Sequence, residues 1–442
     1  MAEVRPFRGI RYNSSRFGRD LSDLVCPPYD VIAPAEHAAL LDRNPWNFVR
    51  LELPRYERSD AADADRYRRA AETYSRWLAD GVLQREARPA LYAYSQRFSL
   101  DGTERERRGI IGALRIEPWE RRVVRPHERT LAGPKRDRLE LMRACDANFS
   151  AIWGLYEDTT GASARLWNGL AGSEPALEAT DLDGVRHQVW VVTDADLLGG
   201  LGAALAPAHC YIADGHHRYE TAMHYEAARC EDGGCSEDSA VHFAMAYLVE
   251  VSDPGLVVFG THRMVRSSQP PAAAAILHTL SQSFDLDDAS GHPISALVAD
   301  LEAESACPAF GVWAPRLGIA RIARLKQQEV PEDLAPGRSL AWRRLDLAAL
   351  HLLAIDRIYP EGTSELSESG SLMYSRSLPE VERALGAGEA QVAFLVRSTS
   401  VEQVTAVADA GDLMPEKSTY FYPKPRSGVV VASLEGEASH SG

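Results

Sequence analysis

The chain has 442 residues, of which 45% are hydrophobic and 25% are charged, and its formal net charge is -15. This composition is typical of a globular protein long enough for two or three domains. The acidic balance argues against a nucleic acid or an anionic membrane surface as a partner, so we expect no DNA and no membrane binding.

The first residues, MAEVRPFRGIRYNSS, lack the apolar core of a secretory signal, and no apolar run in the chain is long enough to span a bilayer. Cys230 and Cys235 form a lone pair in CEDGGC, without a second pair to complete a zinc site. We therefore expect a cytoplasmic protein with six reduced thiols and no bound zinc.

Short β-like runs alternate with helical patterns along the first half of the chain. Residues 59–81 predict a helix that ends at a glycine. Residues 90–98 and 107–117 predict a hairpin that turns at Asp101 and Gly102, and residues 176–194 predict another that turns at Asp183 and Gly184. Residues 150–158 are typical of a strand between these two hairpins.

The second half continues the same alternation. Residues 209–213 predict a short strand followed by a helix to about Arg229, and residues 241–251 and 255–260 predict buried strands. Residues 311–325 predict a further hairpin, and we expect the tail, residues 435–442, to be disordered. The pattern indicates a mixed α+β fold in three regions, residues 1–118, 119–266 and 267–442.

The sequence from Asp214 to Arg218, Asp-Gly-His-His-Arg, is called the DGHHR motif below; it stands where the short strand gives way to the helix. Asp214 is expected to cap the helix, and Gly215 to make the tight turn. The free N–H groups of a helix start suit an oxyanion, and His216, His217 and Arg218 add further donors there. Adjacent histidines project about 100° apart on a helix, so oxyanion binding is favoured over zinc.

Two further groups of residues have chemistry that suits a phosphate site. The basic stretch 121–143 surrounds Glu128, whose alternative role is a surface ion pair. The segment EKSTYFYPK, residues 416–424, is expected to form a phosphate-binding loop, although its aromatic residues are equally suited to core packing. Together with residues at a predicted strand end, the candidate phosphate-binding side chains are Arg125, His127, Arg129, His262, Arg263, Lys417, Ser418, Thr419 and Lys424.

The DGHHR motif resembles the signature of free-serine kinases of the ParB/sulfiredoxin superfamily, and stretches from end to end resemble the DUF1015 family. The matching stretches include CPPYDVIAP, RPHERTLAGPKRDRLELMRA and MPEKSTYFYPK. The resemblance implies a central ParB/sulfiredoxin-like core with N-terminal and C-terminal α/β additions. It also implies Asp214 as a catalytic residue and Glu128 as a general base. The substrates it implies are ADP or ATP with Mg²⁺, which Asp214 is placed to contact.

The sequence thus predicts a phosphotransferase that moves a phosphoryl group from a nucleotide to a small hydroxyl-bearing metabolite, with serine as the first candidate. A nucleotide-binding regulatory module with little turnover and a phosphohydrolase are the two alternatives. The chain has neither a Gly-x-x-x-x-Gly-Lys-Ser/Thr loop nor a cysteine after Gly215, so a P-loop kinase and sulfiredoxin activity are not expected. The acceptor, the nucleotide and the oligomeric state are left open.

Overall fold

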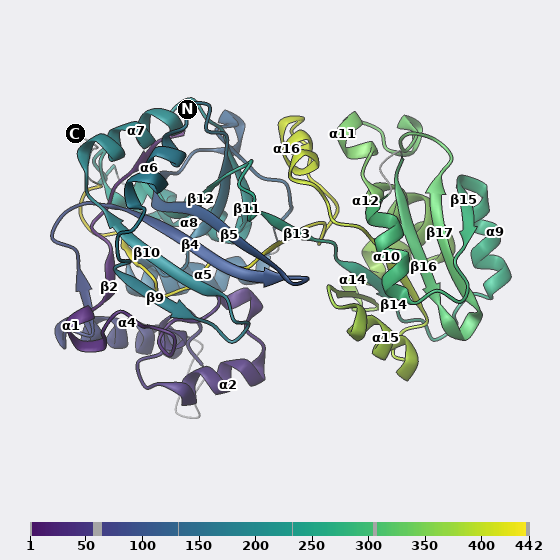
Figure 1. The fold of residues 1–442 in the computed structure, drawn as a ribbon, viewed down its shortest axis with the longest axis horizontal. Coiled ribbons are helices and arrows are strands. Elements are labelled where there is room, and N and C mark those ends of the chain that lie inside the picture. The colour runs from purple at the N-terminus through teal and green to yellow at the C-terminus, as the bar shows by residue number, and fades with distance from the viewer. Residues whose placement is uncertain (1, 56–63, 131, 232, 304–306, 439–442) are drawn as a thin grey trace. The chain divides into compact units, whose positions relative to one another are not determined.

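The computed structural model describes residues 2–55, 64–130, 132–231, 233–303 and 307–438. They form two compact units that interleave along the sequence. Unit 1 comprises Met1–Pro126, Thr130–Leu256 and Pro423–Gly442, and unit 2 comprises His127–Arg129 and Val257–Tyr422. Both units combine helices with sheets, which confirms the predicted mixed α and β class (Figure 1).

Unit 1 is built on a nine-stranded mixed sheet in the order β6-β11-β8-β12-β5-β4-β10-β9, with β1 paired to β5. The β6–β11 and β8–β12 pairs are parallel, and the other pairs are antiparallel. The strands of this sheet are β1 (Val4–Arg5), β4 (Leu91–Leu100), β5 (Thr103–Arg115), β6 (Val124–Arg125), β8 (Ile152–Tyr156), β9 (Leu177–Thr180), β10 (Arg186–Val192), β11 (Cys210–Asp214) and β12 (Phe243–Glu250). Two short ribbons join β2 (Ile10–Tyr12) to β3 (Leu83–Arg85), and β7 (Ala147–Asn148) to β21 (Ala432–Ser433).

Local turn chemistry sets the two predicted hairpins of this sheet. Asp101 and Gly102 both have positive φ, 50° and 75°, which is the backbone that a tight two-residue hairpin needs. They join β4 to β5 in the register Leu100↔Thr103. The second predicted hairpin, β9 to β10, is likewise confirmed, with Gly184 at φ 78° in its turn.

Helices α6, α7 and α8 bury apolar side chains against this sheet. Helix α5 packs against both α4 and α8, and α6 packs on α7 (Figure 1). Leu166 of α6, Leu201 of α7 and Tyr219 of α8 join Ile110 and Ile212 of the sheet in one buried core. The helices are α1 (Ser14–Phe17), α2 (Pro34–Arg43), α3 (Val49–Glu52), α4 (Ala64–Ala79), α5 (Ala132–Cys145), α6 (Ala162–Leu170), α7 (Ala195–Leu205) and α8 (His216–Cys230).

Unit 2 contains a six-stranded antiparallel sheet in the order β15-β17-β16-β19-β14-β18 and a separate β13–β20 ribbon. Its strands are β13 (Val257–Phe259), β14 (His262–Val265), β15 (Phe284–Asp288), β16 (Ala309–Ala314), β17 (Ile319–Leu325), β18 (Leu372–Ser375), β19 (Val392–Leu395) and β20 (Tyr420–Tyr422). Its helices are α9 (Ala273–Ser283), α10 (Ile294–Ala303), α11 (Leu340–Arg343), α12 (Asp346–Ala349), α13 (Asp356–Ile358), α14 (Gly362–Glu368), α15 (Leu378–Ala387) and α16 (Val401–Asp409). The predicted hairpin over residues 311–325 is confirmed as β16 and β17.

The expectations about the cysteines and about the tail are wrong in the described part of the chain. Cys230 and Cys235 form a disulfide, because the loop after α8 brings them together, so these two are not reduced thiols. The tail is ordered through Ala438, whose amide donates to the carbonyl of Asp238 over 2.7 Å. That pairing satisfies a backbone group as Ala438 becomes buried. The predicted helix start near Ser59 and residues 439–442 lie outside the described residues.

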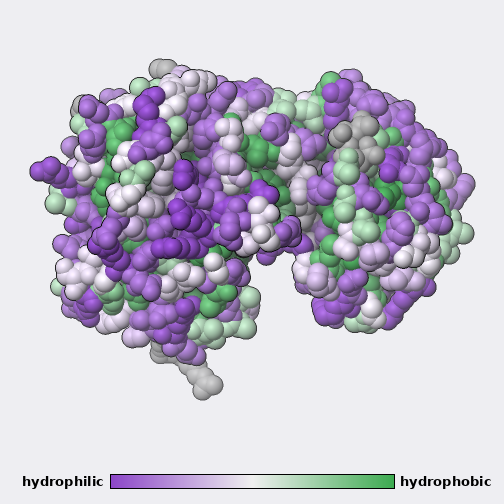
Figure 2. Space-filling model, in the orientation of Figure 1, coloured by the Kyte–Doolittle hydropathy of each residue, from purple (hydrophilic) through white to green (hydrophobic). Residues whose placement is uncertain are grey.

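Hydrophilic residues dominate the face of the molecule drawn in Figure 2. The large hydrophobic side chains exposed among the described residues are Leu182, Leu334 and Leu340. Within the same residues, no helix is both long enough and apolar enough to cross a membrane.

Gly109 in β5 tests the packing of the central sheet. A Cβ atom there would lie 2.5 Å from the carbonyl oxygen of Leu248 on the neighbouring strand. We expect Gly109→Ala to lower the free energy of unfolding by about 1–3 kcal/mol, because overpacking forces the backbone apart. Urea denaturation of the full chain, followed by circular dichroism, measures the change.

Gly199 in α7 is the matched control, because a Cβ there meets no atom within 4 Å. Gly199→Ala is expected to stabilise the chain by about 0.5–1 kcal/mol through the lower entropy of the unfolded backbone. Equal effects of the two substitutions would contradict the packing that we describe.

Candidate functional site

The DGHHR motif forms a strand-turn-helix in unit 1, as the sequence predicts. Asp214 ends β11, Gly215 makes the turn and His216 begins α8. Gly215 has φ 91°, and a Cβ on it would lie 2.9 Å from Nε of Arg218. Glycine is therefore required both for the backbone conformation and for the close approach of the arginine side chain.

Asp214 does not cap α8, which corrects the sequence prediction. The N-cap residue is Gly215, and the described residues provide no side-chain cap for this helix. The carboxylate of Asp214 instead accepts from Nζ of Lys424 through Oδ1 and from Nη2 of Arg218 through Oδ2. Two cations outcompete the neutral N–H groups of the helix start for the same oxygens.

Asp214, Arg218 and Lys424, called the Asp214 cluster below, are almost shielded from water. Their side chains are 14%, 6% and 9% exposed. Burial by itself opposes ionisation of Asp214, but the charges of Lys424 and Arg218 outweigh it and lower the pKa of this carboxyl to about 2. Asp214 is therefore an anion at neutral pH and a poor acceptor of a proton.

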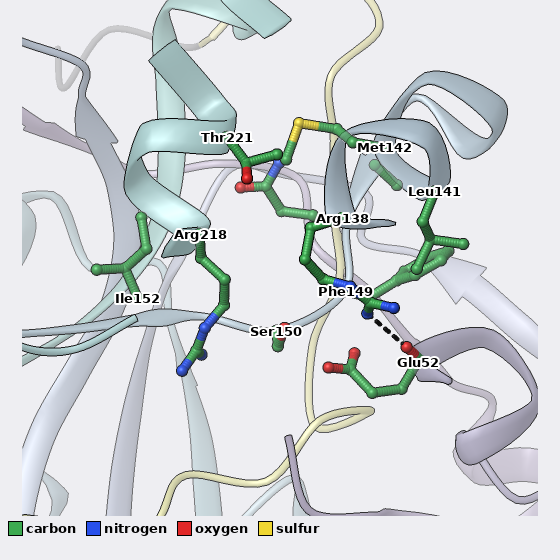
Figure 3. A pocket seen from close by; sticks show the side chains of 11 residues that line it. Glu52, Arg138, Leu141, Met142, Phe149, Ser150, Ile152, Arg218 and Thr221 are labelled. Atoms are coloured by element: carbon green, nitrogen blue, oxygen red, sulfur yellow. Dashed lines mark hydrogen bonds between the residues drawn. The ribbon is translucent and has the colours of Figure 1, made fainter. Parts of the chain in front are cut away.

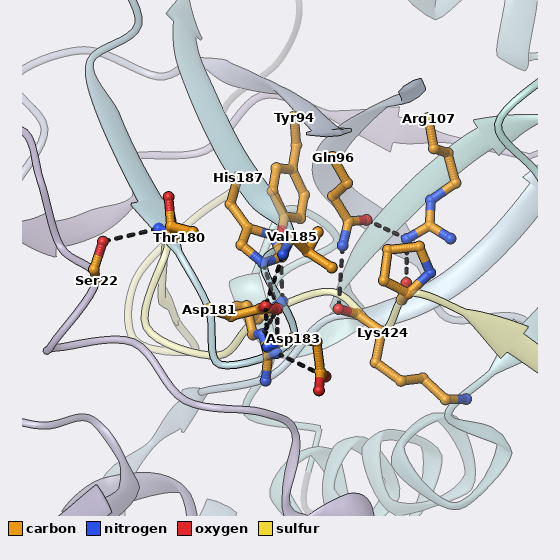
Figure 4. A network of polar contacts seen from close by, with 12 residues as sticks. Ser22, Tyr94, Gln96, Arg107, Thr180, Asp181, Asp183, Val185, His187 and Lys424 are labelled. Carbon is orange, nitrogen blue, oxygen red and sulfur yellow. Dashed lines mark hydrogen bonds and ion pairs between the residues drawn. The ribbon is translucent and has the colours of Figure 1, made fainter. Parts of the chain in front are cut away.

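The backbone that carries Lys424 is fixed by side chains of the unit 1 sheet (Figure 4). Nε2 of Gln96 donates to the carbonyl of Lys424 over 3.1 Å, and Arg107 donates to the carbonyl of Pro423. The guanidinium of Arg107 is fully buried and lies 3.8 Å from the ring centroid of Trp153.

Arg426, two residues after Lys424, is held by a buried network of polar side chains (Figure 4). Asp181 pairs with its guanidinium, with 3.0 Å to Nε, and also lies 3.0 Å from Nε2 of His187. Nδ1 of His187 is 2.8 Å from the hydroxyl of Tyr94, which accepts from the amide of Arg426 over 3.2 Å. Burial lowers the pKa of His187 to about 4, so this histidine is neutral at pH 7. The network is thus a structural clamp on the segment that presents Lys424.

The other side of Arg218 faces a group of residues from the N-terminal part of unit 1. Asp30 lies 3.9 Å from its guanidinium, and Nη1 donates to the carbonyl of Ala151. Nε of Arg218 is buried with no hydrogen-bond partner among the described residues. The arginine therefore has donor capacity that its present contacts do not use.

A cavity of about 30 Å³ adjoins Arg218, with Glu52, Arg138, Ser150 and Thr221 in its lining (Figure 3). This volume is large enough for about one water molecule. Glu52 is fully buried, and burial raises its pKa even though the charges of Arg138 and Arg218 act in the opposite direction. The guanidinium of Arg138 also lies 4.1 Å from the ring centroid of Tyr29.

Sequence reasoning missed Glu52 and Arg138 as neighbours of the motif. Tyr29 and Asp30 could have been found from the sequence, because they lie in CPPYDVIAP, one of the stretches that resemble the DUF1015 family. Glu52 stands in an ordinary apolar segment, NFVRLELP, and no local pattern distinguishes it.

The remaining predicted residues fall in both units. In unit 1, His216 is buried, His217 is partly exposed, and Arg125 donates to the carbonyl of Arg122 over 3.0 Å. Arg129 belongs to unit 2 and is exposed. Their roles in phosphate binding stay predictions.

In unit 2, Glu128 lies against the predicted phosphate loop. Its Oε1 accepts from the backbone amide of Lys417 over 3.1 Å, and Nε2 of the preceding His127 is 2.9 Å from the Thr419 hydroxyl. Ser418 is buried and donates to the carbonyl of Pro415. The structure thus brings together residues that stand almost 300 positions apart, as 289 residues separate Glu128 from Lys417.

Arg263 supports the same loop from the interior of unit 2. It is fully buried and donates to the carbonyls of Glu416 over 2.9 Å and Lys417 over 3.2 Å. The neighbouring His262 is also buried; its Nδ1 accepts from the amide of Val396, and burial lowers its pKa to about 4. In this geometry both side chains shape the loop and the sheet beside it.

The Asp214 cluster does not fit a magnesium ion held by the protein alone. Mg²⁺ requires oxygen ligands in near-octahedral geometry, and both oxygens of Asp214 already accept from cations. The expectation from the sequence that remains is Mg²⁺ that enters already bound to ADP or ATP.

A family model described as protein of unknown function (DUF1015) matches residues 4–348. A search of curated proteins finds no match. Solved structures similar to this chain include a conserved hypothetical protein from Pyrococcus furiosus, with 12% identity, 70% of this chain and 92% of that chain covered, and a TM-score of 0.34.

Two further similar structures are of named proteins. Free serine kinase in complex with AMP shares 12% identity over 67% of this chain and 83% of its own, with a TM-score of 0.33. SbnI with C-terminal truncation from Staphylococcus aureus shares 12% identity over 74% of this chain and 87% of its own, with a TM-score of 0.34.

The Asp214 cluster predicts a particular dependence of stability on pH. Because the folded pKa of Asp214 is below its unfolded value of about 3.9, its contribution is complete above that value and is lost as pH falls through about 2. Lys424→Met removes one of the two cations that pair with Asp214. It is expected to lower the free energy of unfolding at pH 7 by at most about 3–5 kcal/mol, because Arg218 still pairs with the carboxylate. The deficit should shrink between pH 4 and pH 2 in urea denaturation series.

Lys326→Met serves as the control, because the exposed side chain of Lys326 lies in unit 2 and donates through Nζ to a backbone carbonyl, that of Ser281. Its effect is expected to stay within about 0.5 kcal/mol at every pH. A Lys424→Met deficit of the same size at pH 7 and pH 2 would show that Asp214 is not the partner that matters.

Proposed function

We propose that this chain, which belongs to the DUF1015 family, is a phosphotransferase that moves a phosphoryl group from a nucleotide to a small hydroxyl-bearing metabolite. The observation that carries the proposal is the Asp214 cluster at the N-terminus of α8. It combines the positive end of a helix dipole, two cations and one carboxylate in a water-poor setting, which is a composition that suits phosphoryl transfer.

Phosphate oxygens are the natural competitors of Asp214 for its two cations. Arg218 offers a planar fork with an unused buried Nε, and Lys424 offers a point charge. A phosphoryl group that takes over either cation leaves one carboxylate oxygen of Asp214 available to the acceptor hydroxyl. In this scheme His216 and His217 of the first helical turn provide further donors to the phosphoryl oxygens.

The transfer itself forms a bond from the acceptor oxygen to phosphorus and breaks the bond from phosphorus to the oxygen of the nucleotide. The hydroxyl proton must leave to a base, and the low pKa of Asp214 makes it unsuitable for that step. We therefore assign Asp214 to orienting the hydroxyl. Glu128 belongs to unit 2, and its role as the base stays what the resemblance implies.

The test is ³¹P NMR of the full chain with Mg²⁺, ADP or ATP, and serine in a pool of small alcohols. We expect a new phosphomonoester signal with the unmodified chain. Asp214→Asn should slow its appearance by about 100-fold or more, because the anionic group that orients the acceptor hydroxyl is removed. Asp287→Asn is the control, since Asp287 is an exposed carboxylate paired with Arg324 in unit 2, and it should leave the rate unchanged.

Glu128→Gln separates the base from the binding site. Loss of a general base lowers the transfer rate by about 10²–10⁴-fold, whereas nucleotide affinity measured by calorimetry should stay nearly constant. Full activity of this variant would remove Glu128 from the scheme while leaving the Asp214 cluster in place.

Other outcomes of the same experiment favour the alternatives. Free phosphate released without an acceptor indicates a phosphohydrolase. Nucleotide binding with neither a phosphoester nor free phosphate indicates a regulatory module. No nucleotide binding at all contradicts the proposal.

A further inference from the structure

The C-terminal end of α8 carries a second cluster of reactive side chains in unit 1. Cys230 is the last residue of the helix and is joined to Cys235 in the loop that follows. This loop leads to the short helix η3 (Ala240–His242), which ends in His242. Both sulfur atoms and a ring nitrogen of His242 lie within 4.8 Å of one another.

Both ring nitrogens of His242 contact oxygen atoms, one of a carboxylate and one of a backbone carbonyl. Its Nδ1 lies 2.7 Å from Oε1 of Glu226, one helical turn before Cys230, and its Nε2 lies 3.0 Å from the carbonyl of Ser236. A carboxylate on one ring nitrogen fixes the orientation of the ring and makes the other nitrogen a better ligand, although this nitrogen has to leave the carbonyl of Ser236 to bind a metal. The lone cysteine pair that the sequence shows thus acquires a third donor and a supporting carboxylate from the fold.

We propose that the reduced chain binds one Zn²⁺ through Cys230, Cys235 and His242, and that the disulfide abolishes this site. Two thiolates and one imidazole are a donor set that zinc accepts, with water in the fourth position. The cluster is only partly exposed, and the two cysteines pack on the small apolar group of Tyr225, Val241 and Leu434. The proposal is independent of the function of the Asp214 cluster.

The chemistry needs a thiol reductant. A dithiol transfers two electrons to the Cys230–Cys235 bond, which leaves two protein thiols and the oxidised form of the reductant. On metal binding, both thiols lose their protons and two zinc–sulfur bonds form, while a nitrogen of His242 donates its lone pair. Exchange with the disulfide form of the reductant, which accepts the two electrons, re-forms the Cys230–Cys235 bond and releases the ion.

Co²⁺ is the probe, because it occupies zinc sites and gives visible absorption and a thiolate charge-transfer band. The full chain is reduced under anaerobic conditions, freed of reductant and titrated with Co²⁺. We expect one Co²⁺ per chain, with a thiolate band that excess Zn²⁺ removes. The oxidised chain should show no such band.

Variants identify the ligands. Cys235→Ser and His242→Gln are each expected to abolish tight binding, and Glu226→Gln to weaken it about 10-fold or more through loss of the supporting carboxylate. Cys307→Ser is the control, because Cys307 is a partly exposed thiol in unit 2. Circular dichroism of each variant confirms that it is folded.

The absence of cobalt binding by the reduced chain overturns the proposal. So does a thiolate band that persists in Cys235→Ser or is lost in Cys307→Ser, since either result assigns the metal to other cysteines. Binding that His242→Gln leaves unchanged removes the histidine and with it the site as proposed.

Discussion

The ion pairing of Asp214 with Lys424 is the interaction on which unit 1 depends most. A carboxylate that is 14% exposed is costly unless cations accompany it, and this one is separated from Lys424 by 210 residues. The chain must therefore return from unit 2 to unit 1 at a fixed position. Arg107, Gln96 and the polar network around Asp181 hold the returning segment in that position.

Besides its ion pair with Asp30, Arg218 influences the carboxyl groups of Asp214 and Glu52, whose environments differ. Asp214 has direct contact with two cations, so its pKa falls, whereas the burial of Glu52 outweighs the charges of Arg138 and Arg218, so its pKa rises. Carboxyls that one arginine influences in this way are suited to different tasks, one as a permanent anion and the other as a group that gains a proton more easily.

Local patterns of the sequence are sufficient for much of the fold but not for the site. The turns at Asp101–Gly102 and Gly184 are predictable because their backbone preferences act over two or three residues. The capping role of Asp214 was wrong because a distant lysine competes for the same carboxylate. Glu52 and the approach of His242 to the cysteine pair depend in the same way on tertiary packing, which no local spacing encodes.

In the proposed function, the charge balance of the Asp214 cluster determines how a phosphate binds. The chain is acidic overall, with a net charge of -15, and the two cations of the cluster are already paired. An incoming phosphate therefore replaces a carboxylate instead of filling an uncompensated positive pocket. The affinity for phosphate is then the difference between two interactions of the same cations, one with the phosphate and one with Asp214. The displaced Asp214 also has to find a new hydrogen-bond donor in a buried setting. An acceptor hydroxyl is such a donor, so binding of the phosphoryl group and orientation of the acceptor would be energetically linked.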